Sequence, residues 1–168
     1  LELACNPELV TEITLQPVRR YGVDAAIFFS DIMVPLFLAG FPVRIVPGRG
    51  PTVDDPISSR SDLVRLSARP ELTAVQEAVS LLIKELSVPL IAFAGAPFTV
   101  ASYLVEGGPS RTFARTKALM HQEPGLWEEL CLRLADLAVA FLSAQVGAGA
   151  AAVQLFDSWA GALPPDVY

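Results

Sequence analysis

The sequence has few of the side chains that most often hold metals or form disulfides. Among its 168 residues are two cysteines and one histidine. Cys5 and Cys131 each stand alone, without a CxxC pair or a nearby histidine, so neither a disulfide framework nor a zinc site is predicted. The single histidine, His121, lies between two predicted helices, and the sequence around Ser158 lacks a G-x-S-x-G motif, which argues against Ser-His nucleophilic catalysis. Free cysteines fit a reducing compartment, and we expect a cytoplasmic protein.

Charged side chains are also scarce, and most of them are acidic. They make up 18% of the residues, against 52% hydrophobic residues, and the net charge is -6. A negative long-range field repels phosphates, so nucleic acid is not an expected partner. The high apolar content excludes disorder and predicts one domain with a sizeable core.

Two runs, residues 86–105 and 137–156, contain no charge over 20 residues, which is the length that spans a bilayer. Prolines and glycines inside a helix would leave unpaired backbone groups in lipid. A helix, a glycine turn and a buried strand explain both runs, so no membrane partner is expected. The interrupting residues are Pro89, Gly95 and Pro97 in the first run and Gly147 and Gly149 in the second.

The apolar pattern predicts strands that alternate with helices. Strands that are apolar throughout and separated by helices are typical of a parallel sheet, with all carboxyl ends at one edge. This order fits a (β/α)8 TIM barrel in the α/β class, with about half of the barrel present. A doubly wound sheet has the same pattern, but no G-x-G-x-x-G follows a strand. We expect strands at 23–29, 88–94 and 150–156, a possible short strand at 43–46, and helices at 7–20, 71–86, 98–105, 111–120 and 124–146.

Three polar residues belong to the edge where the predicted strands end. Asp31 follows the first strand, where it is either the N-cap of a helix over 32–39 or a functional carboxylate in costly apolar surroundings. Tyr103 lies on the helix after the second strand, as a core ring or a ligand contact. Ser158 follows the third strand and is either a turn residue or part of a site.

Five segments in this order resemble the uroporphyrinogen decarboxylase family, and together they span nearly the whole chain. The resemblance implies a single partial barrel domain over residues 1–168. It also implies a carboxy-lyase that converts the four acetate side chains of uroporphyrinogen to methyl groups, giving coproporphyrinogen in haem biosynthesis without a metal or prosthetic group. The segments are VDAAIFFSDI (23–32), VPGRGP (46–51), GAPFT (95–99), SYLVEGG (102–108) and LFDSWAG (155–161).

The resemblance implies roles for the same three residues. Asp31 takes the place of the acid that meets the pyrrole N–H groups and stabilises positive charge on the protonated ring. Tyr103 and Ser158 take the places of residues that contact the substrate carboxylates or the acid itself. A cytoplasmic homodimer with facing clefts is the implied assembly.

The resemblance also implies parts that lie outside this sequence. An arginine-rich stretch is expected before Leu1 and a functional histidine after Tyr168, so we expect the isolated chain to be inactive as a decarboxylase. One alternative is a cobamide-dependent methyltransferase of the same superfamily, whose zinc would need ligands that Cys5, Cys131 and His121 do not offer by spacing. A second alternative is a catalytically inert truncated domain that binds partners through its apolar surface.

Overall fold

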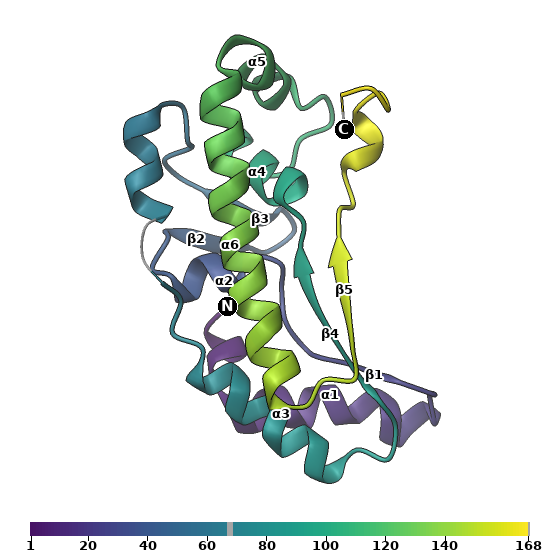
Figure 1. Cartoon of the computed structure of the whole chain (residues 1–168). Coiled ribbons are helices and arrows are strands. Elements are labelled where there is room, and N and C mark those ends of the chain that lie inside the picture. The colour runs from purple at the N-terminus through teal and green to yellow at the C-terminus, as the bar shows by residue number, and fades with distance from the viewer. Residues whose placement is uncertain (67–68, 168) are drawn as a thin grey trace.

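The computed structural model describes residues 1–66 and 69–167, and a three-stranded parallel sheet forms one side of it (Figure 1). The strands β1 (Ala26–Ile27), β4 (Leu90–Gly95) and β5 (Ala152–Phe156) are arranged in the order β1-β4-β5. All pairings are parallel. The carboxyl ends therefore meet at one edge, as the sequence predicted.

Three helices pack together over one face of this sheet. They are α1 (Pro7–Tyr21), α3 (Thr73–Glu85) and α6 (Pro124–Ala148), of which α6 contacts β4 and α1 contacts β1. Alternate residues of β4 are buried in this direction, while those between them are partly exposed. The core of this layer includes Val10, Leu15, Phe28, Val79, Leu82, Leu90 and Phe141.

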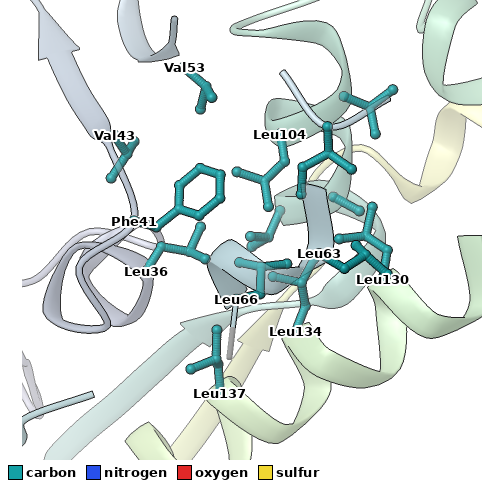
Figure 2. Packing of buried hydrophobic residues seen from close by; sticks show 14 of the residues in the cluster. Leu36, Phe41, Val43, Val53, Leu63, Leu66, Leu104, Leu130, Leu134 and Leu137 are labelled. Carbon is teal, nitrogen blue, oxygen red and sulfur yellow. The ribbon is translucent and has the colours of Figure 1, made fainter. Parts of the chain in front are cut away.

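A second core lies beside the first and supports the edge where the strands end (Figure 2). It joins α6 to α4 (Pro97–Glu106), α2 (Val34–Leu38) and the antiparallel hairpin of β2 (Val43–Val46) and β3 (Gly50–Val53). The helix α5 (Ala114–Gln122) packs on α4 and α6. Short 3-10 segments complete the chain: η1 (Glu2–Cys5), η2 (Arg60–Leu66) and η3 (Ala160–Ala162).

Local signals explain where α1 begins and ends. The Asn6 side chain accepts a hydrogen bond of 3.0 Å from the N–H of Leu9, and Pro7 occupies the first helical position. Gly22 ends the helix with φ of 61°, a left-handed conformation that glycine adopts without strain. The predicted helix over 7–20 is confirmed, with one further residue at its end.

Two strand predictions are wrong in extent or burial. Residues 23–29 were predicted to form a strand buried on both faces, but only Ala26 and Ile27 pair, and Ile27 is 60% exposed. All residues of β5 are exposed as well. In the sheet of the described residues β5 is an edge strand and helices cover one face, whereas a continuous apolar run predicts cover on both faces.

The helix α6 is, among the described residues, long and apolar enough to cross a membrane by length and composition. This is weak support for a span, because the core helix of a globular protein passes the same test. The helix contacts α3, α4 and β4 within the protein. The uncharged run 137–156 divides into the end of α6, a turn at Gly149 with φ of 120°, and β5, as the sequence predicted, except that β5 is exposed.

Candidate active site

The three predicted site residues come together at the edge where the strands end. Asp31 follows β1, Ser158 follows β5, and Tyr103 lies on α4, which begins directly after β4. The ring of Trp159, next to Ser158, lies 4.2 Å from the ring of Tyr103 between centroids. The charge of Asp31 acts on the phenol of Tyr103. Segments far apart in sequence thus form one group.

Asp31 is half-buried and makes a local hydrogen bond. Its Oδ1 accepts from the N–H of Met33 at 2.8 Å, and its carbonyl accepts from the N–H of Val34 at 3.0 Å. The predicted N-cap role of Asp31 for a helix over 32–39 is wrong, because α2 begins at Val34 and its N-cap is Met33, without a side-chain capping bond. The bond from the N–H of Met33 instead closes a turn just before the helix, and it orients the Asp31 carboxylate.

Tyr103 carries a phenol that stays protonated. Burial raises the pKa of Tyr103 above its ordinary value, and the negative charge of Asp31 raises it further. A protonated phenol donates a hydrogen bond, which suits a carboxylate partner. Ser158, by contrast, is exposed and lies in a turn in which the N–H of Ala160 bonds the carbonyl of Asp157 at 3.1 Å.

Gly95 allows β4 to approach the segment that holds Asp31. A Cβ atom at this position would lie 2.8 Å from Cβ of Ile32 and 2.6 Å from Cγ2 of Val100. Contacts that short are not tolerated, so the glycine is required for this approach. The end of β4 is also joined to β5, because the N–H of Ala96 donates to the carbonyl of Phe156 at 2.7 Å.

Sequence reasoning missed Thr99, Asp157 and Trp159 as members of this group. Thr99 and Asp157 are hydrogen-bonded through the side chain at 2.6 Å, and Trp159 packs on Tyr103 and Phe113. The sequence did place both residues at the edge where the strands end, since Thr99 lies in the first turn of the helix after the second strand and Asp157 directly follows the third. These positions could have indicated that the two side chains meet.

The charge of Asp157 also reaches Cys131. Burial, and then the Asp157 carboxylate, raise the pKa of the Cys131 thiol to about 12, which leaves it unreactive. Within residues 1–66 and 69–167, no group of three or more His, Cys, Asp or Glu side chains is arranged to hold a metal ion.

The fold has a counterpart among solved structures. A methyltransferase from Methanosarcina mazei matches with a TM-score of 0.75 over 99% of this chain and 50% of that chain, at 21% identity. At this identity the likeness shows the fold alone. It confirms the predicted α/β barrel class, with about half of the barrel present.

Sequence comparisons identify the family. The family model described as uroporphyrinogen decarboxylase (URO-D) matches residues 1–168. A uroporphyrinogen decarboxylase of Streptomyces coelicolor is 60% identical over all of this chain and 48% of its own length, and that of Salinispora tropica is 59% identical over 97% and 45%. The chain thus spans about half the length of the curated relatives that it matches. The chain belongs to the uroporphyrinogen decarboxylase family.

Proposed function

We propose that the protein carrying this chain is a carboxy-lyase that converts uroporphyrinogen to coproporphyrinogen in haem biosynthesis, by decarboxylating four acetate side chains. Residues 1–168 form one partial barrel domain of it in this proposal. The observation that carries the proposal is the match of the whole chain to this family, and it is supported by Asp31 lying at the strand ends, near enough for its charge to raise the pKa of Tyr103.

We assign to Asp31 the stabilisation of the positive charge that develops on the substrate. Protonation of a pyrrole turns the ring into its own electron sink, so positive charge develops within the macrocycle during loss of carbon dioxide. A fixed carboxylate that faces several pyrrole N–H groups stabilises this charge more in the transition state than in the ground state. Each such charge-assisted hydrogen bond contributes roughly 1.5 to 3 kcal/mol. The bond from the N–H of Met33 supports this role, because it fixes the carboxylate before substrate arrives.

Tyr103 and Ser158 are assigned to substrate binding. The raised pKa of Tyr103 keeps its phenol a hydrogen-bond donor, which fits a substrate carboxylate or Asp31 itself. The hydroxyl of Ser158 is exposed at the same edge and can donate to a carboxylate. In this mechanism the substrate supplies the electron sink, so no cofactor is part of the proposal.

The remaining assignments concern partners and location. A cytoplasmic homodimer is proposed from the family resemblance, with no nucleic-acid or membrane partner. The net charge of -6 supports the absence of a nucleic-acid partner.

The test uses the complete product of the reading frame that carries this chain. Uroporphyrinogen is supplied, and coproporphyrinogen is measured as the fluorescent coproporphyrin after oxidation and chromatography. Asp31→Asn keeps the acceptor for the N–H of Met33 but loses the charge, so we expect kcat to fall by about 100-fold or more. Asp31→Ala removes both the charge and the acceptor, and we expect no measurable turnover.

The matched control is Asp24→Asn. Asp24 is an exposed acid just before β1, at the opposite end of the strand from Asp31. We expect it to keep wild-type kinetics. Near-normal rates in Asp31→Asn, with the variant folded by circular dichroism, would contradict the assigned role.

A further inference from the structure

The start of α4 and the end of β5 are joined by hydrogen bonds between Thr99 and Asp157. Oδ1 of Asp157 accepts from the hydroxyl of Thr99 at 2.6 Å and from its backbone N–H at 3.1 Å. The threonine oxygen in turn accepts from the N–H of Trp159 at 3.1 Å. We call these three hydrogen bonds the Thr99–Asp157 lock.

The lock is specific in its hydrogen-bonding pattern. A threonine hydroxyl has one proton, which is directed to the carboxylate, and its lone pairs remain free to accept from Trp159. Thr99 is 1% exposed, so water does not compete for these bonds at the threonine. The carboxylate also lies at the amino end of α4, a helix of 10 residues, where negative charge is favoured.

The lock fixes the residues on both sides of Ser158. Asp157 is held through its side chain and Trp159 through its backbone N–H, so the backbone of Ser158 between them has little freedom. The indole ring of Trp159 then packs 4.2 Å from the ring of Tyr103 and 4.9 Å from that of Phe113. Through this ring, the lock reaches a second residue of the candidate site.

We propose that Thr99 and Asp157 are positioning residues, which hold Trp159 and the backbone of Ser158 so that Tyr103 and Ser158 meet the substrate in a productive geometry. The proposal rests on the proposed function for its activity readout. Neither residue of the lock is required to touch the substrate. Displacements of about 1 Å in supporting residues are sufficient to lower turnover by about 100-fold.

The test compares Thr99→Val with Thr99→Ser in the complete product of the reading frame. Valine keeps the shape of threonine but has no hydroxyl, whereas serine keeps the hydroxyl. The position of the ring is followed by ¹⁹F NMR of protein labelled with 5-fluorotryptophan, with the Trp159 signal assigned by its loss in Trp159→Phe. For Thr99→Val we expect a shifted or broadened Trp159 signal and a fall in kcat/KM of about tenfold or more. For Thr99→Ser we expect the wild-type signal and a rate within about threefold.

The matched control is Thr11→Val on α1. Thr11 is also a buried threonine with a bonded hydroxyl, donating to the carbonyl of Pro7 at 2.7 Å, but it lies away from the strand ends. We expect a loss of stability in this variant without a change in the Trp159 signal or in kcat/KM. This separates positioning from general destabilisation.

Two results would overturn the proposed positioning role of Thr99 and Asp157. An unchanged Trp159 signal in Thr99→Val, or a loss of activity that Thr99→Ser fails to recover, overturns the proposal. If Thr99→Val does not fold, Asp157→Asn takes its place, with the same expected change in signal. If the wild-type protein does not decarboxylate uroporphyrinogen, the proposed function fails, and the ¹⁹F comparison still decides whether the lock positions the ring.

Discussion

Single residues are most constrained where two segments approach each other at the strand ends. Gly95 is the clearest case, because a side chain there would overlap with Ile32 and Val100. Ile32 is the neighbour of Asp31, so any displacement of this segment reaches the carboxylate. By contrast, Gly147 lies on the exposed side of α6, and a Cβ there would meet nothing within 4 Å.

Gly95→Ala and Gly147→Ala are therefore predicted to act in opposite directions. We expect Gly95→Ala to lower the free energy of unfolding by about 1 to 3 kcal/mol, through overlap with its two neighbours. We expect Gly147→Ala to raise it by about 0.5 to 1 kcal/mol, because alanine favours a helix over glycine. Urea unfolding followed by circular dichroism measures both, and a change of the same sign in the two variants would contradict the argument.

The candidate site was only partly predictable from the residues themselves. An acid directly after an apolar strand is costly unless it has a partner, which singled out Asp31, but the same position also fits a helix cap, and the family resemblance supplied the proposed role. The bond between Thr99 and Asp157 was not predicted, since the two are 58 residues apart and only the packing of α4 against the end of β5 brings them together. Residue type and position placed these side chains at the edge where the strands end, but only the tertiary structure shows which of them bond to each other.

At the scale of elements, helices were predicted better than strands. The ends of α1 depend on Asn6, Pro7 and Gly22, which act within a few residues of the helix they bound. The extent of β1 depends on its pairing with β4, which is distant in the sequence. β3 pairs with β2 through a short hairpin, so the signal missed there was the local turn at residues 47–49. The short strand at 43–46 was predicted as observed, but its partner β3 was assigned to irregular structure.

Asp62 organises the turn that leads into η2. Its Oδ2 accepts from the N–H groups of Ser58 and Ser59 at 2.9 and 2.8 Å. The bond from the Ser58 N–H, with those from Ser59, lowers the pKa of Asp62 to about 2. Because the pKa in the folded state lies below that of the unfolded chain, the charged carboxylate stabilises the fold above about pH 4. The contribution is lost as the pH falls toward 2.

Asp62→Ala is predicted to destabilise the protein in a pH-dependent manner. We expect a loss of about 1 to 2 kcal/mol near neutral pH, because the two N–H groups lose a charged acceptor. The difference from wild type should shrink as the pH falls from about 4 toward about 2. Thermal unfolding at several pH values measures it, with the exposed Asp24→Ala as the control. A difference that is constant over this range would rule out the ionised carboxylate as its source.

At the scale of the whole molecule, the alternation of apolar runs was sufficient to predict a parallel α/β sheet, whereas the choice of a barrel over a doubly wound sheet also used the lack of a G-x-G-x-x-G motif and the family resemblance. The same pattern was not sufficient to predict which strand residues are exposed to solvent, because the sequence does not show which faces of the sheet other elements cover. Among the described residues β5 is an edge strand, and its Val153 and Leu155 are 48% and 47% exposed. Unpaired strand edges with apolar side chains favour association with another chain.

The 168-residue chain is accordingly predicted to self-associate. We expect its sedimentation coefficient to rise with concentration, and we expect Val153→Lys on β5 to weaken this association by at least tenfold, since a charge opposes edge pairing. Val64→Lys is the matched control, because Val64 is 71% exposed but lies on η2. A chain that stays monomeric at all concentrations, or equal effects of both variants, would contradict the role of β5.

The separation of the two lock residues along the chain has a consequence for synthesis. Asp157 is added 58 residues after Thr99, which takes roughly 3 to 12 seconds at about 5 to 20 residues per second on the ribosome. During that interval α4 can form, but the side chain of Thr99 has no Asp157 carboxylate to bond and the ring of Tyr103 has no Trp159 indole to contact. The three hydrogen bonds of the lock and the contact between the two rings can therefore form only after β5 has been synthesised.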